Sequence, residues 1–388
     1  MLNRRILRIK VIQTIYSLIQ SKESNYHIGL EKIAEKFAPN LMAEEKQDLM
    51  LLENKKKTAS ELYVQFFEKN DSSYLQAETE IKAAVTEAVL FYNNQNQQDK
   101  KHYKDVLEED IQVVEHMYYF LLVCVARLLQ IAELDQKESA HVLKTEIDPE
   151  YFFKLQNNKV LIAIDSHPKL RAYTEKYKLN PPFDEIKTVF KKFIKKDPIY
   201  IEYSKAPSSN FETDKNIVLH IVKTYLFKQE SLKTLWEDMD YHWVENAETV
   251  RSLVLKCIKG ISENENLFVL PDLSPNWEED YAFMQDLFKN TINRDTEIEG
   301  YISSKIKNWD MDRLAIMDKM ILKVALTEMI DFTGIPVKVS INEYIDISKT
   351  YSTPKSKQFV NGLLDTISEE LIKNGVIKKS GKGLLDNK

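Results

Sequence analysis

The chain has 388 residues, of which 43% are hydrophobic and only 8 are glycine, which excludes collagen-like and disordered classes because enough apolar surface is present to form cores. Its net charge of −6 excludes attraction of polyanions over the whole surface, so any nucleic acid must bind a local basic patch. The two cysteines exclude a disulfide framework and a four-thiolate zinc site, and they are typical of a reducing cytoplasm, where we expect the protein.

The N-terminal segment predicts an amphipathic helix over residues 3–20. Its apolar stripe consists of Leu7, Val11, Ile15 and Leu18, which follow the 3.6-residue period. Arg4 and Arg8 lie four residues apart, so we expect them to share the solvent face. No acidic residue precedes Glu23, which makes this helix locally basic and gives no sign of a secretory signal.

The rest of the N-terminal region predicts a helical bundle over residues 1–135. Further helices are expected at residues 29–37, 43–69, 73–93 and 107–132. The apolar run at 118–132 contains Arg127 and is shorter than the roughly 20 residues that a membrane span needs. We therefore expect its helix to lie at the centre of the bundle rather than in a membrane.

Residues 136–210 predict a linker or inserted region, because asparagine, proline and serine interrupt shorter stretches there. One helix is expected near residues 183–196. Residues 160–164 are apolar enough for a strand, but an isolated strand has no pairing partner, so helix or loop is the better interpretation.

Residues 211–388 predict a second helical region with a degenerate internal duplication. Trp243 is followed by Val254-Leu255-Lys256, and Trp309 is followed at a similar distance by Ile321-Leu322-Lys323. The alternative is a chance resemblance between amphipathic helices.

The motifs of several enzyme classes are absent from the sequence. There is no phosphate-binding or dinucleotide-binding glycine loop, no H-E-x-x-H motif and no C-x-x-C motif. Asp240 and His242 are spaced as metal ligands could be, but such a pair is more often structural. Cys124 lies among apolar residues that disfavour a thiolate. We therefore expect no enzyme, no metal and no cofactor.

The segment from Gly334 to residue 373 predicts two capped helices. Gly334 and Pro336 end the preceding helix, and Ser340 with Glu343 forms a capping-box pattern for a helix that ends near residue 351. Thr353-Pro354 predicts the start of a helix over 355–373. We expect its first turn to expose Lys355, Ser356 and Lys357 around unpaired backbone N–H groups, which suits a phosphate. The alternative is an ordinary bundle helix with solvated lysines.

A series of short motifs resembles the C-terminal signature of the NusB transcription antitermination family: Ile335-Pro336-Val337, Ile341-Asn342-Glu343, Ser348-Lys349, Lys355-Ser356 and the run from Phe359 to Asp365. The preceding Leu314-Ala315, Asp318, Ile321-Leu322-Lys323, Ala325 and Glu328 are similar to the central helix of the family. Arg4-Arg5, Arg8, Gln13 and Tyr16 are similar to its arginine-rich first helix. The resemblance covers under a third of the chain, as in enlarged NusB-like proteins with an expanded middle.

The resemblance implies an all-α protein of two helical bundles with additional inserted helices. It implies binding to boxA-type single-stranded RNA of ribosomal RNA leader transcripts, a complex with the small-subunit ribosomal protein NusE, and association with RNA polymerase. The RNA-contacting residues would be Arg4, Arg5, Arg8, Lys355, Ser356, Lys357, Gln358 and Phe359. Lys10 joins them because Ile6 stands where many members have another arginine. Phe359 could equally be a core residue.

The same resemblance places Tyr16 and Asp318 towards NusE, with Asp318 shorter than the glutamate that is usual in the family. The RNA assignment requires both ends of the chain to meet in one cationic groove.

A first alternative is an accessory domain of a ribosomal RNA-modifying enzyme, but Cys124 and Cys257 lack the Pro-Cys context that such a nucleophile needs. A second alternative is a helical scaffold that has lost RNA binding, against which the intact arginines argue.

Overall fold

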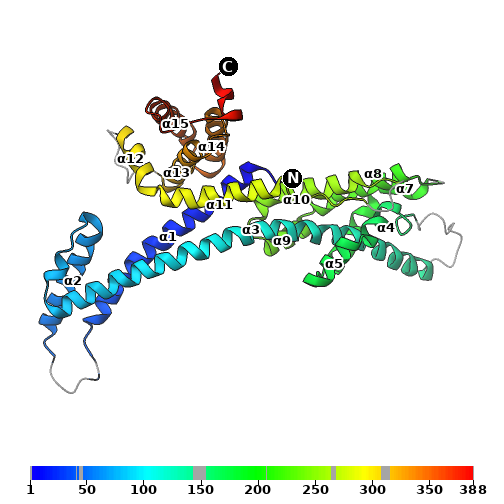
Figure 1. Ribbon diagram of the computed structural model, residues 1–388. Coiled ribbons are helices and arrows are strands. Elements are labelled where there is room, and N and C mark those ends of the chain that lie inside the picture. The colour runs from blue at the N-terminus through cyan, green and yellow to red at the C-terminus, as the bar shows by residue number, and fades with distance from the viewer. Residues whose placement is uncertain are drawn as a thin grey trace. The chain divides into compact units, whose positions relative to one another are not determined.

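The computed structural model describes residues 2–40, 42, 47–142, 154–206, 208–263, 268–306 and 315–387 (Figure 1). Every regular element in these ranges is a helix and none is a strand, so the predicted all-α class is confirmed. The chain forms two compact units. The first unit is Met1–Ile6 with Glu109–Asp280, and the second unit is Leu7–Glu108 with Tyr281–Lys388. Both are discontinuous in sequence, so they differ from the linear division at residues 135 and 210, which stays a prediction.

The second unit contains most of α1 (Arg4–Lys36), α2 (Leu49–Lys69), the 3₁₀ helix η1 (Ser73–Gln76) and the first half of α3 (Thr79–Val142). It also contains most of α11 (Trp277–Asn293), then α12 (Asp295–Lys305), α13 (Ile316–Asp331), α14 (Val337–Tyr351), α15 (Ser356–Lys373) and the 3₁₀ helix η6 (Gly381–Asn387).

The first unit contains the rest of α3, α4 (Lys159–Ser166), α5 (Pro168–Tyr177), α6 (Phe183–Lys192), the 3₁₀ helix η3 (Ile194–Lys196) and α7 (Pro198–Lys205). Next come α8 (Phe211–Ile221), the π-helical turn η4 (Val222–Leu226), α9 (Glu230–Met239) and α10 (Trp243–Gly260). In its described part, the region predicted as a linker or insertion therefore contains the end of α3 and the four helices α4 to α7. Residues 160–164 are helical, which agrees with the rejection of a strand.

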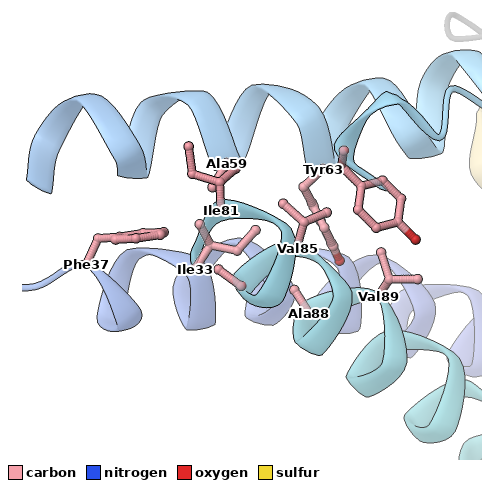
Figure 2. Packing of buried hydrophobic residues seen from close by; sticks show 10 residues of the cluster. Ile33, Phe37, Ala59, Tyr63, Ile81, Val85, Ala88 and Val89 are labelled. Atoms are coloured by element: carbon pink, nitrogen blue, oxygen red, sulfur yellow. The ribbon is translucent and has the colours of Figure 1, made fainter. Parts of the chain in front are cut away.

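The end of α1, α2 and the start of α3 enclose a hydrophobic core (Figure 2). Ile33 from α1, Tyr63 from α2 and Val85 from α3 are fully buried in it. Asp48 caps α2 by accepting hydrogen bonds from the backbone N–H groups of residues 50 and 51. Gly29 is required for close packing, because a β-carbon there would lie 2.1 Å from the Tyr63 hydroxyl oxygen.

A polar seam joins α1 to α3 further along the two helices. The Asn25 side-chain amide donates hydrogen bonds to the side-chain oxygens of Asn96, at 2.9 Å, and Asp99, at 2.6 Å. The hydroxyl groups of Ser21 and Tyr103 lie 2.7 Å apart. A buried polar contact of this kind stabilises one register of two packed helices over the others, because a shift would leave the amide unpaired.

Helices α13, α14 and α15 pack against one another in the second unit (Figure 1). Helix α13 is buried all round from Met320 to Ile330, which is the pattern of a central helix. The chain after α15 turns at Gly375, whose φ of 72° lies in the left-handed region, and returns to the α13–α14 connection. There Ser380 N–H donates to the Thr333 carbonyl oxygen at 3.0 Å.

Several predicted helix boundaries are wrong. The helices expected at 3–20 and 29–37 are the single helix α1, and those expected at 73–93 and 107–132 are joined in α3. Ser340 is not a helix cap, since α14 begins at Val337 and the Ser340 hydroxyl lies inside the bundle. Pro354 precedes α15 by two residues, and Lys355 at the cap makes no side-chain capping bond. Trp309 and Leu314 lie outside the described residues, so the duplication stays a prediction.

Among the described residues, α3 is the one helix long and apolar enough to cross a membrane by length and composition. Within the most apolar part of this helix, 72% is buried inside the protein. Such burial is typical of a core helix, as the sequence predicts for residues 118–132.

Candidate functional site

The N-terminal helix is joined to the C-terminal bundle by a buried ion pair. The Arg8 guanidinium donates two hydrogen bonds, of 2.7 and 2.8 Å, to the two carboxylate oxygens of Glu328. The same carboxylate accepts hydrogen bonds from the Ser340 hydroxyl at 2.7 Å and the Tyr344 hydroxyl at 2.8 Å. Four donors therefore satisfy a carboxylate that is 0% exposed. We call Arg8, Glu328, Ser340 and Tyr344 the Arg8 cluster.

Aromatic rings and a second carboxylate complete the surroundings of Arg8. The guanidinium carbon lies 5.4 Å from the Phe283 ring centre and 5.8 Å from that of Tyr344. Glu343 lies 3.6 Å from one guanidinium nitrogen. Burial by itself lowers the pKa of Arg8, but the hydrogen bonds and the charge of Glu328 outweigh it and raise the pKa above its ordinary value. Burial also raises the pKa of Tyr344, so its hydroxyl stays a donor.

The structure therefore differs from the expectation that Arg4 and Arg8 share a solvent face. Arg8 is buried by its contacts with residues that lie more than 300 positions away in the sequence. Lys10 is also buried, with 2% of its surface exposed. Contact of these two residues with RNA stays a prediction, although neither cation is at the surface of this conformation.

The other two arginines of α1 lie nearer to solvent. Arg4 forms ion pairs with Glu279 and, at 2.9 Å, with Asp280. Burial opposes the charge on Arg4, but hydrogen bonds to Asp280 and Glu279 raise its pKa. Arg5 is exposed. It belongs to the first unit, as Arg4 does.

The start of α15 places two exposed lysines on either side of a buried serine. Lys355 and Lys357 are exposed, and neither makes a hydrogen bond or an ion pair in the described part of the chain. The Ser356 hydroxyl is instead buried and donates to an Asp318 carboxylate oxygen at 2.6 Å. The expectation that Ser356 is exposed is wrong, because this hydrogen bond turns its side chain into the bundle. Gln358 is exposed and Phe359 is half-buried.

The two residues predicted to face a protein partner are in different environments. Tyr16 is 36% exposed on α1. Asp318 is buried at the start of α13, where one carboxylate oxygen accepts the Ser356 hydrogen bond and the other has no hydrogen-bond partner among the described residues. A buried acceptor without a donor is unfavourable by about 1–3 kcal/mol, so a donor that reached this oxygen would be stabilised.

Catalytic and metal-binding chemistry finds no support in the described residues. No group of three or more His, Cys, Asp or Glu side chains could hold a metal ion there. The Asp240 carboxylate instead accepts hydrogen bonds from the His242 backbone N–H and the Asn246 side chain. Both cysteines are buried, and burial raises the pKa of Cys124 and raises that of Cys257 to about 12, so neither is a reactive thiolate.

Sequence reasoning identified the exposed cations of α15 but missed the Arg8 cluster. Glu328 belongs to the family-like motifs, and the sequence placed it only in the central helix, whereas Ser340 was assigned a capping role. A signal was present, since a glutamate within an otherwise apolar helix needs a buried cationic partner. The sequence did not identify that partner as Arg8.

Comparison with known proteins gives the same family as the sequence motifs. The NusB family model matches residues 248–369, from within α10 to within α15. A transcription antitermination protein NusB from Chloroherpeton thalassium is 38% identical over 36% of this chain and 62% of its own length. The protein of that name from Salinibacter ruber is 40% identical over 26% of this chain and 64% of its own length. This chain thus spans less than two thirds of either relative.

This chain spans a larger share of a third relative. The transcription antitermination protein NusB from Methylacidiphilum infernorum is 38% identical over 29% of this chain and 78% of its own length. A solved structure of NusB from T. maritima is 26% identical over 34% of this chain and 82% of that chain, with a TM-score of 0.23. The three sequence relatives are proteins of the transcription antitermination class by name. The chain belongs to the NusB family, and it is larger than its typical members.

Proposed function

We propose that this protein is a cytoplasmic, non-catalytic antitermination factor that binds boxA-type single-stranded RNA of ribosomal RNA leader transcripts. It would act with NusE and associate with RNA polymerase. The observation that carries the proposal is the pair Lys355 and Lys357 within the family-matched block. Both are exposed and have no partner among the residues that the structure describes, whereas other lysines such as Lys137 and Lys305 pair with carboxylates.

The start of α15 has the chemistry that unpaired RNA requires. Two ammonium groups stand at the N-terminal end of an 18-residue helix, where the helix dipole also favours an anion. Gln358 offers hydrogen-bonding groups to a base edge, and Phe359 offers an aromatic face beside them. On α1, Arg5 is the exposed arginine that we propose as a further phosphate contact.

Fluorescence anisotropy with a labelled boxA RNA tests the proposal across a salt series. The double variant Lys355→Gln, Lys357→Gln removes two phosphate contacts, so the slope of log affinity against log salt should become shallower by about 1.4, at about 0.7 per phosphate. The matched control is Lys373→Gln, Lys378→Gln, which removes the same charge from exposed lysines beyond the matched residues. An equal loss in both variants would mean non-specific attraction and would contradict the assignment.

A second arm of the same experiment adds purified NusE. The exposed Tyr16 is the residue that we propose as a NusE contact, so Tyr16→Ala should weaken NusE binding in calorimetry but leave RNA binding without NusE unchanged. Equal NusE affinity for the variant and the parent would place the interface elsewhere. Loss of NusE binding with intact RNA binding would support the residue assignment independently of the α15 lysines.

A further inference from the structure

The turn between α9 and α10, in the first unit, exposes a small apolar knob. Tyr241 is 99% exposed, Val244 is 78% exposed and Met239 is 44% exposed, and the three residues lie within six positions. We call them the Tyr241 knob. Single exposed apolar residues are ordinary, but three together on one turn are a feature of interaction surfaces. The knob precedes the residues matched by the family model, so the NusB relationship assigns it no role.

The knob stands on a buried, hydrogen-bonded base. One Asp240 carboxylate oxygen accepts from the His242 backbone N–H at 2.8 Å, and the other accepts from the Asn246 side-chain amide at 2.9 Å. Asp240 and Asn246 are buried. Trp243 is also buried, and its ring lies parallel to that of Phe227, with centroids 6.1 Å apart.

These buried hydrogen bonds restrict the conformations that the turn can adopt before a partner binds. A preformed turn loses little conformational entropy on association, which favours binding. The exposed tyrosine adds a large, rigid contact surface, of the kind that dominates the binding energy of protein interfaces. Both properties are typical of an anchor residue that enters a pocket on another protein.

The charged residues near the Tyr241 knob indicate which class of partner could bind it. From Lys233 to Arg251 the chain contains five acidic residues against one lysine and one arginine, which gives this segment a net charge of −3 (2 − 5). Asp240 is buried, and the others form an acidic rim, of which Glu237 and Glu248 pair at the surface with Lys233 and Arg251. An acidic rim repels nucleic-acid phosphates and also repels the same turn on a second copy of this chain.

We propose that the Tyr241 knob docks a basic protein, one that presents an apolar socket for Tyr241 within a positively charged surface. Burial of the ring supplies the affinity, and the acidic rim speeds the encounter and fixes the orientation. The surface is separate in sequence from the residues proposed for RNA and NusE, so the inference goes beyond the proposed function and stands without it.

The test begins with site-specific photocrosslinking of the full-length chain in the cells that produce it. Tyr241→p-benzoylphenylalanine places the reactive group on the knob, and Tyr177→p-benzoylphenylalanine is the matched control at another exposed tyrosine of the first unit. The crosslinked protein is then purified, and its binding to the unlabelled parent chain is measured by calorimetry across a salt series.

The proposal requires a product that forms at position 241 but not at 177, that survives nuclease treatment, and whose protein component is basic. Tyr241→Ala should then weaken binding of that purified protein by about 30-fold, as for an interface anchor. Asp238→Lys, at the exposed rim, should weaken binding most at low salt. A nuclease-sensitive product, a crosslinked dimer of this chain, an acidic protein, equal products at both positions, or no product at 241 would overturn the proposal. Unchanged affinity of Tyr241→Ala would do the same.

Discussion

Replacement of Arg8 gives a quantitative test of the Arg8 cluster. Arg8→Met removes both guanidinium hydrogen bonds from a carboxylate that is fully buried, and leaves only the hydroxyl donors of Ser340 and Tyr344. Loss of one partner from a buried ion pair costs about 3–5 kcal/mol, because the remaining charge is uncompensated. A folded protein has a total stability of about 5–15 kcal/mol, so the loss is a large share. Urea unfolding followed by helical circular dichroism measures it.

A double variant separates the cost of an unpaired charge from the value of the pair. In Arg8→Met, Glu328→Gln no buried charge remains in the Arg8 cluster, and the amide oxygen still accepts a hydrogen bond from Ser340 or Tyr344. We expect this variant to be more stable than Arg8→Met alone by roughly 1–3 kcal/mol, the usual coupling between contacting residues. The same protein also tests the predicted RNA contact, since loss of one phosphate contact would make the salt slope shallower by about 0.7.

Two results would refute the reasoning. If Arg8→Met lowered the free energy of unfolding by less than about 1 kcal/mol, the value of an exposed ion pair, the guanidinium could not be buried against Glu328 in solution. If the double variant were no more stable than Arg8→Met, the unpaired charge would not be the cause of the loss. An unchanged RNA salt slope in the folded double variant would leave Arg8 with a structural role alone.

Two further substitutions test the packing and the electrostatics. Gly29→Ala should lower the free energy of unfolding by about 1–2 kcal/mol in urea titrations, because overpacking against the rigid, buried Tyr63 outweighs the roughly 1 kcal/mol that alanine adds to a helix. The control is Gly300→Ala, where an added β-carbon would have no atom within 4 Å, and this variant should be neutral or stabilising. If Gly300→Ala were the more destabilising of the two, the packing at Gly29 would be contradicted. Burial disfavours the ionised form of the Asp197 carboxylate and by itself raises its pKa. Hydrogen bonds from Tyr225 and His220 outweigh this effect and lower the pKa to about 2. The contribution of the ionised Asp197 carboxylate to the free energy of unfolding is therefore complete above about pH 4 and is lost as the pH falls through 2. Asp197→Asn should flatten the pH dependence of the free energy of unfolding over that range. An unchanged pH dependence would exclude this role.

The sequence predicts where helices lie better than where they begin and end. Apolar periodicity correctly predicts a helix in the first part of α1, because a buried face requires apolar residues at helical spacing, and the Thr353-Pro354 start signal predicts α15 to within one residue. The sequence predicts separate helices at residues 73–93 and 107–132, with the polar stretch between them as a break. In the structure this stretch is helical, and Asn96 and Asp99 accept hydrogen bonds from Asn25 of α1, a long-range contact that no pattern of neighbouring residues predicts.

The same limit explains the errors at the candidate site. Ser340 and Glu343 have the spacing of a capping box, but the Ser340 hydroxyl donates to Glu328 on another helix. Arg8 has the spacing of a solvated cation and is nevertheless enclosed by partners distant in sequence. Lys355 and Lys357 were correctly expected at the surface, since nothing in the surrounding bundle competes with water for their charges.

The discontinuity of the two units has a consequence for synthesis. The Arg8–Glu328 pair joins residues that are 320 positions apart, and ribosomes add about 5–20 residues per second. About 15–65 seconds therefore separate the appearance of the arginine from that of its carboxylate. During this interval the Arg8 guanidinium has no Glu328 carboxylate to pair with. The N-terminal helix can therefore make its buried ion pair only after the ribosome has added the residues of α13.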